Sequence, residues 1–288
     1  MSSTKDRIED VKIWQKVVPE EALRHEFLMD GLLALSALHL ASENPKSRWE
    51  YTQMAMHYQT SALCGYQDAL QNITSDNHNG IFAYSVILNN LSLAFPNVCA
   101  DPASASHAES IITLIELVQG TGRISATNVV SLRSGKFAAF FVSFPYHDHP
   151  LAPDPDVAHA LSQLRSHVEC IRDPADDSRH RAYITGIDAL ETSFGHIAGA
   201  QHLAHVLVWT TMVSKDLVRL FQGGDVMARL VFVHYGVLLL EARGRWWARE
   251  TGRCLIGELV RDICGEKPEW RGWTEWAVGR AEGVGRDS

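Results

Sequence analysis

Apolar residues recur at helical spacing along almost the whole chain, and this periodicity limits the possible fold more than any other feature. Residues 27–41, FLMDGLLALSALHLA, form one apolar helical run, and residues 49–73 carry an apolar stripe with positions mostly three or four apart. Alternating runs typical of strands are hard to find. The sequence therefore predicts an all-α protein, a single large helical bundle of about ten to twelve helices.

Turn and capping residues set the expected helix boundaries. Pro96 is expected to end the third helix, and Gly120 with Gly122 the fourth. The predicted helices are residues 19–41, 49–73, 77–95, 104–120, 156–172, 176–194, 197–221, 225–242 and 245–264, followed by a short one with Trp273 and Trp276.

Residues 145–155, PYHDHPLAPDP, hold four prolines and cannot form a helix. This segment is the predicted linker between the two halves of one helical domain that spans residues 19–282. Residues 1–18 are expected as a polar N-terminal segment, and residues 283–288 as a tail.

Charge and hydropathy limit the partners. The 288 residues carry 26 Lys and Arg against 34 Asp and Glu, a net charge of −8, so no general attraction to nucleic acid or anionic lipid is expected. The most apolar runs, 27–41 and 226–240, include Asp30, His39, Arg229 and His234 and fall short of the roughly 20 residues of a membrane span. We expect no direct DNA binding and no membrane span.

The cysteines and histidines give no strong sign of a metal centre. Five widely spaced cysteines without a Cys-x-x-Cys pair fit the reducing cytoplasm or nucleus. His202 and His205 share a helix face with His196 before them, but no third ligand completes a zinc spacing. The segment 147–149, His-Asp-His, could orient a base or be an ordinary polar loop. No metal and no cofactor are expected.

Several segments in order along the chain resemble a known family. Residues 25–41, HEFLMDGLLALSALHLA, resemble the first core helix of the fungal transcription factor domain that follows zinc-cluster DNA-binding modules, in particular in sterol uptake control regulators. Trp14 and residues 19–22 look like the entry segment of that domain. Residues 51–66, 115–120, 206–209, 234–240, 246–247 and 270–276 look like later segments. Thr210 and Ala277 stand where the family usually has proline.

The resemblance implies a helical bundle with an apolar pocket in its C-terminal half, able to bind a sterol or similar lipid. It also implies a homodimer, or a heterodimer with a related regulator, in the nucleus or cytoplasm. The six-cysteine zinc cluster that would precede the domain is missing from this sequence, so a DNA-binding role does not carry over.

Bulky apolar side chains with a few polar tips gather in the C-terminal half and suit the lining of such a pocket. Ordinary core packing is the alternative for each of them, and His234 could bind a ligand oxygen or be a hydrogen-bonded core histidine. The predicted ligand-binding residues are Trp209, Met212, Phe232, His234, Tyr235, Leu239, Trp246 and Trp247.

Three functions remain open. The first is a stand-alone regulator-like domain that binds a hydrophobic small molecule, a sterol or other terpenoid or lipid, or a regulator partner. The second is a cofactor-free cyclase or isomerase of fungal secondary metabolism, with His234, Tyr235 or Asp188 as the proton or hydrogen-bond donor. The third is a fragment of a longer gene product. No nucleotide-binding or hydrolase motif supports other enzymes.

Overall fold

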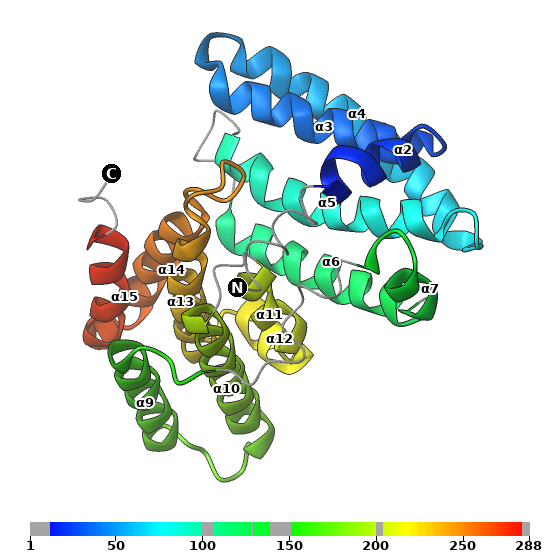
Figure 1. Cartoon of the computed structure of the whole chain (residues 1–288). Coiled ribbons are helices and arrows are strands. Elements are labelled where there is room, and N and C mark those ends of the chain that lie inside the picture. Colours follow the sequence, from blue (N-terminus) through cyan, green and yellow to red (C-terminus); the bar gives the residue numbers. More distant parts are fainter. Residues whose placement is uncertain (1–11, 99–105, 128, 139–150, 200–203, 284–288) are drawn as a thin grey trace. The chain divides into compact units, whose positions relative to one another are not determined.

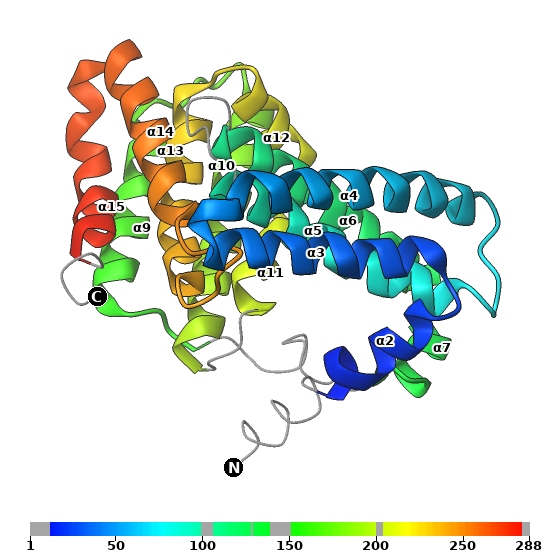
Figure 2. The same ribbon diagram turned by 90° about the horizontal axis from the view of Figure 1, so that it is seen from above.

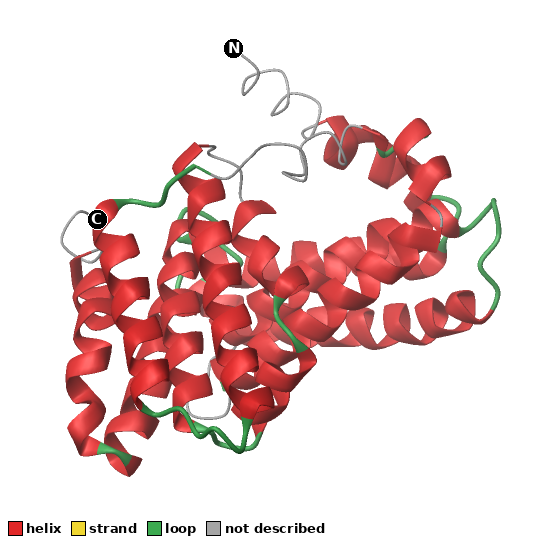
Figure 3. Ribbon diagram, turned by 90° about the horizontal axis from the view of Figure 1, so that it is seen from below, coloured by secondary structure: helices red, strands yellow, loops and turns green. Residues whose placement is uncertain are grey.

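The structure is a computed structural model that describes residues 12–98, 106–127, 129–138, 151–199 and 204–283. These residues form thirteen α-helices with short π and 3-10 turns and contain no strand (Figure 3). The predicted all-α class is confirmed. The chain divides into two compact units, residues 1–105 with 113–145, and residues 106–112 with 146–288.

The first unit is built on a helical hairpin. Helix α3 (Glu26–Glu43) and helix α4 (Arg48–Gln71) lie side by side and antiparallel, joined at Asn44 and the 3-10 turn Pro45–Ser47 (Figures 1 and 2). Small residues make the close packing possible: Ala37, Ala55 and Ala62 are all buried. The predicted first helix is divided here, because a π-helical turn (Ile13–Val17) and α2 (Val18–Ala22) precede α3.

Helix α5 (His78–Val98) packs on α3 and forms the centre of this unit. The ring of Tyr84 occupies the space beside Gly31, where an added Cβ would lie 2.6 Å from the ring. Tyr84 also contacts Tyr66 of α4 and Phe27 of α3, with ring centroids 4.8 and 5.9 Å apart. The apolar run around Phe27 therefore joins α3 to both neighbouring helices.

Two polar contacts fasten α2 and α5 to the end of this unit, which continues through most of α6 (His107–Thr127) into α7 (Val129–Ser134). The buried carboxylate of Glu21 pairs with Lys136. The Nε2 of His78 lies 3.0 Å from the hydroxyl of Ser131. A buried carboxylate without such a cation would be strongly unfavourable.

Helix α5 is also the one described helix that is long and apolar enough to cross a bilayer, but 67% of its apolar window is buried inside the protein. Two further segments, Lys215–Gln222 and Val226–Ala242, meet the same criteria only when taken together, and they are bent by 109°. Core helices of ordinary proteins reach such length and hydropathy as well.

The second unit surrounds one apolar helix, α13 (Val226–Leu239), of which twelve residues are buried. Helices α9 (Pro155–Cys170), α10 (Asp177–Gly199), α11 (Ala204–Met212) and α12 (Lys215–Gln222) precede it. The 3-10 turn Leu240–Ala242, α14 (Thr251–Glu266), the 3-10 turn Pro268–Trp270 and α15 (Arg271–Gly283) follow (Figure 1).

Helices α13 and α14 approach each other at two glycines. A Cβ added to Gly252 would lie 2.6 Å from the carbonyl oxygen of Gly236 and 2.8 Å from the backbone nitrogen of Leu240. A Cβ on Gly236 would lie 2.6 Å from the side chain of Ile256. Only glycine allows the two backbones to come this close.

Several predicted boundaries were wrong. The single helix expected at 197–221 is two helices, because the hydroxyl of Ser214 accepts a hydrogen bond from the backbone N–H of Leu217 and starts α12. Residues 243–250 form turns, so the helix expected from 245 begins at Thr251. Pro96 lies inside α5, and α6 continues past Gly120 and Gly122 to Thr127.

Residues 151–154 are not helical and α9 begins at Pro155, as the proline-rich segment predicts. The rest of that segment, with His147, Asp148 and His149, lies outside the described residues, as do His202 and the side chain of His205.

Candidate functional site

The structure brings three of the predicted ligand-binding residues together inside the second unit. The phenol ring of Tyr235 stacks on the indole of Trp209, with centroids 4.2 Å apart, and Phe232 meets the same indole edge-on at 5.0 Å. All three side chains are completely buried. We call these three residues, with Phe221, the aromatic cluster.

Neighbouring helices fix each member of the aromatic cluster. The indole Nε1 of Trp209 donates a hydrogen bond to the carbonyl oxygen of Gly186 on α10, 3.0 Å away. Phe221 of α12 stacks on Phe232 at 3.9 Å. Four helices, α10 to α13, thus meet at this cluster.

One polar group of the aromatic cluster makes no hydrogen bond among the described residues. The hydroxyl of Tyr235 is buried and finds no hydrogen-bond partner among the described residues. An unpaired buried hydroxyl costs about 1–3 kcal/mol relative to one in water. Burial also raises the pKa of this phenol far above its usual value, so it stays protonated and can donate a hydrogen bond.

His234 points to a different part of the unit. It lies two residues after Phe232, about 200° around the helix, and its imidazole stacks on Trp276 of α15 at 5.2 Å. Its Nδ1 is 2.9 Å from the carbonyl oxygen of Leu230, and because a carbonyl only accepts, Nδ1 carries the hydrogen. Burial lowers the pKa of His234 to about 4, so the ring is neutral at pH 7.

The remaining predicted residues are dispersed. Leu239 is buried on α13, whereas Met212 at the end of α11 is 46% exposed. Trp246 and Trp247 are half-buried in the turns between α13 and α14. The predicted set therefore includes one compact group, Trp209, Phe232 and Tyr235, while the other five residues lie elsewhere on α13, at the end of α11 and in the turns after α13.

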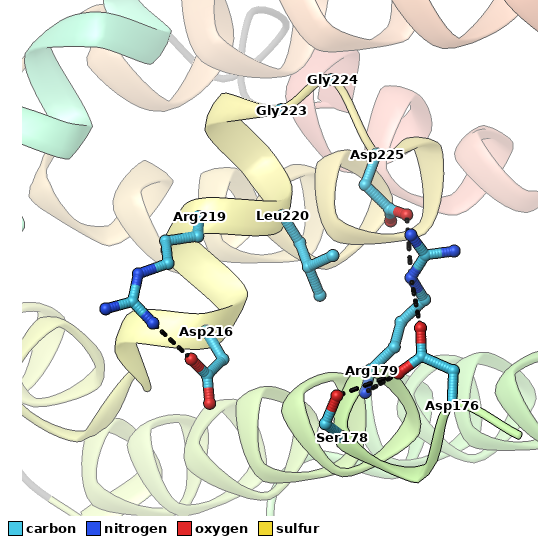
Figure 4. Close-up of a pocket in the computed structure, with 9 residues that line it drawn as sticks. All are labelled: Asp176, Ser178, Arg179, Asp216, Arg219, Leu220, Gly223, Gly224 and Asp225. Atoms are coloured by element: carbon cyan, nitrogen blue, oxygen red, sulfur yellow. Dashed lines mark hydrogen bonds and ion pairs between the residues drawn. The ribbon is translucent and has the colours of Figure 1, made fainter.

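A polar hollow of about 470 Å³ lies elsewhere in the same unit, and sequence reasoning missed it. It forms where the turn between α12 and α13 meets the first turn of α10 (Figure 4). None of the predicted ligand-binding residues lines it. The lining residues are Asp176, Ser178, Arg179, Asp216, Arg219, Leu220, Gly223, Gly224 and Asp225.

The helix caps around this hollow explain its shape. Asp225 caps α13 by accepting a hydrogen bond from the backbone N–H of Ala228 at 2.8 Å. Gly224, with a φ of +82°, makes the preceding turn, which favours glycine. The sequence Gly-Gly-Asp before an apolar run indicates a helix cap at this position. It does not indicate that residues of α10 lie opposite the cap.

A second hollow of about 220 Å³ shares Asp176, Arg179 and Asp225 with the first. Its wall is more apolar, with Val168, Ile171, Val226, Met227 and Trp270, and also includes Arg172, Asp173, His180 and Tyr183. The phenol of Tyr183 donates to the carboxylate of Asp225 at 2.8 Å, so desolvation and this carboxylate raise its pKa. We call the two adjoining hollows the Asp225 groove.

Among the described residues, no group of three or more His, Cys, Asp or Glu side chains is placed to bind a metal ion. His196 is partly buried near the end of α10. The side chains described at the two sites form hydrogen bonds, ion pairs and apolar contacts.

Comparison with known proteins gives a family match in the N-terminal half of the chain. Residues 11–148 match the family described as fungal specific transcription factor domain. The chain is similar to this family over these residues, so the resemblance seen in the sequence is confirmed. The match covers all of the described part of the first unit.

Relatives of the fungal transcription factor domain extend the similarity to both units. A Zn(2)-C6 fungal-type transcription factor of Gibberella zeae is 22% identical over 92% of this chain. Sterol uptake control protein 2 of Candida albicans is 24% identical over 90%, and that of Saccharomyces cerevisiae 23% over 91%. The chain spans 56%, 38% and 29% of the lengths of these relatives. No solved structure matches it significantly.

Proposed function

We propose that this chain binds a hydrophobic small molecule, a sterol or another terpenoid or lipid, at the aromatic cluster of its second unit. The observation that carries the proposal is the hydroxyl of Tyr235, which is buried, protonated and without a partner among the described residues. A ligand hydroxyl or carbonyl would complete its hydrogen bonding, while the rings of Trp209 and Phe232 contact the apolar body.

Two further facts support a sterol-like ligand. Two relatives that align over 90% or more of the chain are named sterol uptake control proteins. A sterol also has the required shape, since it presents one hydroxyl at the end of a rigid apolar body. Aromatic side chains that stack on each other form flat, apolar surfaces suited to such a body.

We further propose that the domain acts in the nucleus by pairing with itself or with a related regulator, and that it makes no DNA contact of its own. The net charge of −8 supports the second point, because DNA-binding domains carry excess positive charge. Ligand binding would then change regulator output through the partner.

The experiment compares two tyrosines of the second unit. Binding of a fluorescent sterol to the purified chain is measured by titration, with native mass spectrometry in lipid extract to report ligand mass and subunit count. Tyr235→Phe should weaken sterol binding by about 5- to 10-fold, the value of one hydrogen bond. Tyr183→Phe, whose hydroxyl contacts Asp225 outside the aromatic cluster, should not.

Absence of both lipid binding and association with a regulator would refute this function. If instead the ligand is converted to a product above the spontaneous background, the site acts as a cofactor-free enzyme, the second function considered from the sequence. Equal affinities of Tyr235→Phe and the unaltered chain would remove Tyr235 from the site.

A further inference from the structure

The Asp225 groove is distinct from the aromatic cluster and has its own chemistry. Charged side chains stand on two sides of its larger hollow, with the half-buried side chain of Leu220 between them (Figure 4). On one side Arg219 pairs with Asp216 at 2.8 Å. On the other side Arg179 lies beside Asp176 and Asp225.

Most of the polar groups in the larger hollow that make no hydrogen bond to the described residues are arginine N–H groups. Arg179 donates no side-chain hydrogen bond among the described residues, because its Nε is 3.5 Å from Asp176 and 3.9 Å from Asp225. Arg219 uses only one nitrogen, Nη1, for Asp216. A guanidinium group has five N–H donors in a planar fork that matches a carboxylate.

The three aspartates of the larger hollow differ in the hydrogen bonds that they accept. Asp176 accepts hydrogen bonds from the hydroxyl of Ser178 and from the backbone N–H of Arg179. Asp225 accepts from Tyr183 and from the backbone of Ala228. Asp216 keeps one oxygen, Oδ2, without a partner in the described part of the chain. Oδ2 of Asp176 accepts no hydrogen bond there and lies 3.5 Å from the Nε of Arg179, its ion-pair partner. The hollow thus offers donors to an anionic group and acceptors to a cationic group, and the acceptor without an arginine beside it is Oδ2 of Asp216.

The balance of charge limits what can bind. Three aspartates face two arginines in the larger hollow, so a group with two negative charges, such as a phosphate monoester, would meet net repulsion. A ligand with one carboxylate and one ammonium group adds no net charge and can use both the arginines and Asp216. The charges that line the larger hollow therefore suit a zwitterionic ligand.

The lining of the smaller hollow indicates what kind of side chain the ligand carries. It shares Asp176, Arg179 and Asp225 with the larger one, so the two hollows adjoin. Its wall of Ile171, Met227 and Trp270 is apolar, and its volume of about 220 Å³ has room for a branched or aromatic side chain.

We propose that the Asp225 groove binds a free α-amino acid with an apolar side chain. Arg179 and Arg219 bind the carboxylate, Asp216 binds the ammonium group, and the side chain enters the smaller hollow against Trp270. The second unit would then have an amino-acid site in addition to the proposed lipid site. The two sites share no residue.

The test is calorimetric titration of the full chain with leucine, leucinamide and N-acetyl-leucine. Leucinamide lacks the carboxylate and N-acetyl-leucine lacks the ammonium group, so each should bind at least about tenfold more weakly than leucine. Glycine, with no side chain for the smaller hollow, should also bind more weakly. Leucine that binds no better than leucinamide and N-acetyl-leucine would overturn the proposal.

Two variants complete the test. Arg179→Gln should lower leucine affinity by about tenfold or more. Arg181→Gln is the matched control, because Arg181 is on the same helix and pairs with Asp177 outside the groove. Thermal unfolding of both variants checks that they are folded. Equal leucine affinity of the Arg179→Gln variant and the control would also overturn the proposal.

Discussion

The phenol of Tyr235 and the indole of Trp209 are stacked 4.2 Å apart with an interplanar angle of 23°, yet only the indole has a hydrogen-bond partner among the described residues. Trp209 donates to Gly186, whereas the hydroxyl of Tyr235 is unpaired in the described part of the chain. The stack therefore combines a satisfied and an unsatisfied polar group in one buried contact. This imbalance leads to the first prediction.

Tyr235→Phe should raise the free energy of unfolding of the ligand-free chain by about 1 kcal/mol, because it removes a buried hydroxyl with no partner among the described residues. Urea unfolding measures the difference. Tyr183→Phe is the matched control and should lower stability by about 1–2 kcal/mol, since it breaks a hydrogen bond to a carboxylate. A loss of stability in Tyr235→Phe would mean that the hydroxyl is already paired.

Acid should destabilise the second unit through His234. Histidine has an ordinary pKa of 6.5, whereas the pKa of His234 in the folded chain is about 4, so the unfolded state binds more protons between these values. Stability is therefore complete above about pH 6.5 and falls by about 2–3 kcal/mol as the pH drops to 4.5.

In the variant His234→Leu, the free energy of unfolding should fall by about 2–3 kcal/mol less between pH 7 and pH 4.5 than in the unaltered chain. Urea unfolding at the two pH values measures the difference. His57→Gln, an exposed histidine of α4, serves as the control and should keep the pH dependence of the unaltered chain. An unchanged pH dependence in His234→Leu would contradict the assignment.

Gly252→Ala should destabilise the chain by about 3 kcal/mol, because the added methyl meets backbone atoms of α13 that cannot move independently. Gly257→Ala on the same helix has open space and should raise stability by about 0.5–1 kcal/mol. Thermal unfolding of the two variants gives opposite shifts if the helix contact is as described. A neutral Gly252→Ala would show that α13 and α14 are further apart.

Glu258→Ala should weaken the start of α6. The carboxylate of Glu258 accepts hydrogen bonds from the hydroxyl of Ser106 at 2.6 Å and from the backbone N–H groups of His107 and Ala108 at 2.9 and 3.3 Å. Losing this charged helix cap should cost about 2 kcal/mol.

Hydrogen exchange at the first turn of α6 locates the effect of Glu258→Ala and should become faster there. Asp262→Asn, an exposed change on the same helix as Glu258, should leave this exchange unaltered. Unchanged exchange in both variants would show that the carboxylate does not hold the helix.

The helices could be predicted because their signals are local. The apolar run that includes Phe27 and the apolar segment around His234 are both helices, as their spacing indicates. Helix α13 is buried almost throughout, whereas α3 is buried on one face and leaves Leu33 and Leu40 exposed.

The break at Ser214 was missed because the buried apolar residues on either side, Val213 and Leu217, are four positions apart and continue the helical spacing, and only a single hydroxyl marks the new start. Pro96 was expected to end the helix, but α5 continues for two residues beyond it, to Val98.

The sites were harder to predict because they depend on pairs far apart in the sequence. Trp209 and Tyr235 were both predicted as ligand-binding residues because they are aromatic. The sequence near each residue does not show that the two rings stack, or that the hydroxyl of Tyr235 is unpaired among the described residues. Helical geometry could have separated His234 from Phe232 in advance. Arg179 and Asp225 are 46 positions apart, and each looks like an ordinary surface charge until the fold brings them together.

The close contact between α13 and α14 also restricts how this protein can change over evolution. Position 252 is open to glycine alone, because any side chain there meets the backbone of the opposite helix. Position 236 faces the side chain of Ile256, so a larger residue at 236 is compatible only with a smaller one at 256. Descendants and distant relatives that keep this helix pair should retain the glycine and show correlated substitutions at 236 and 256.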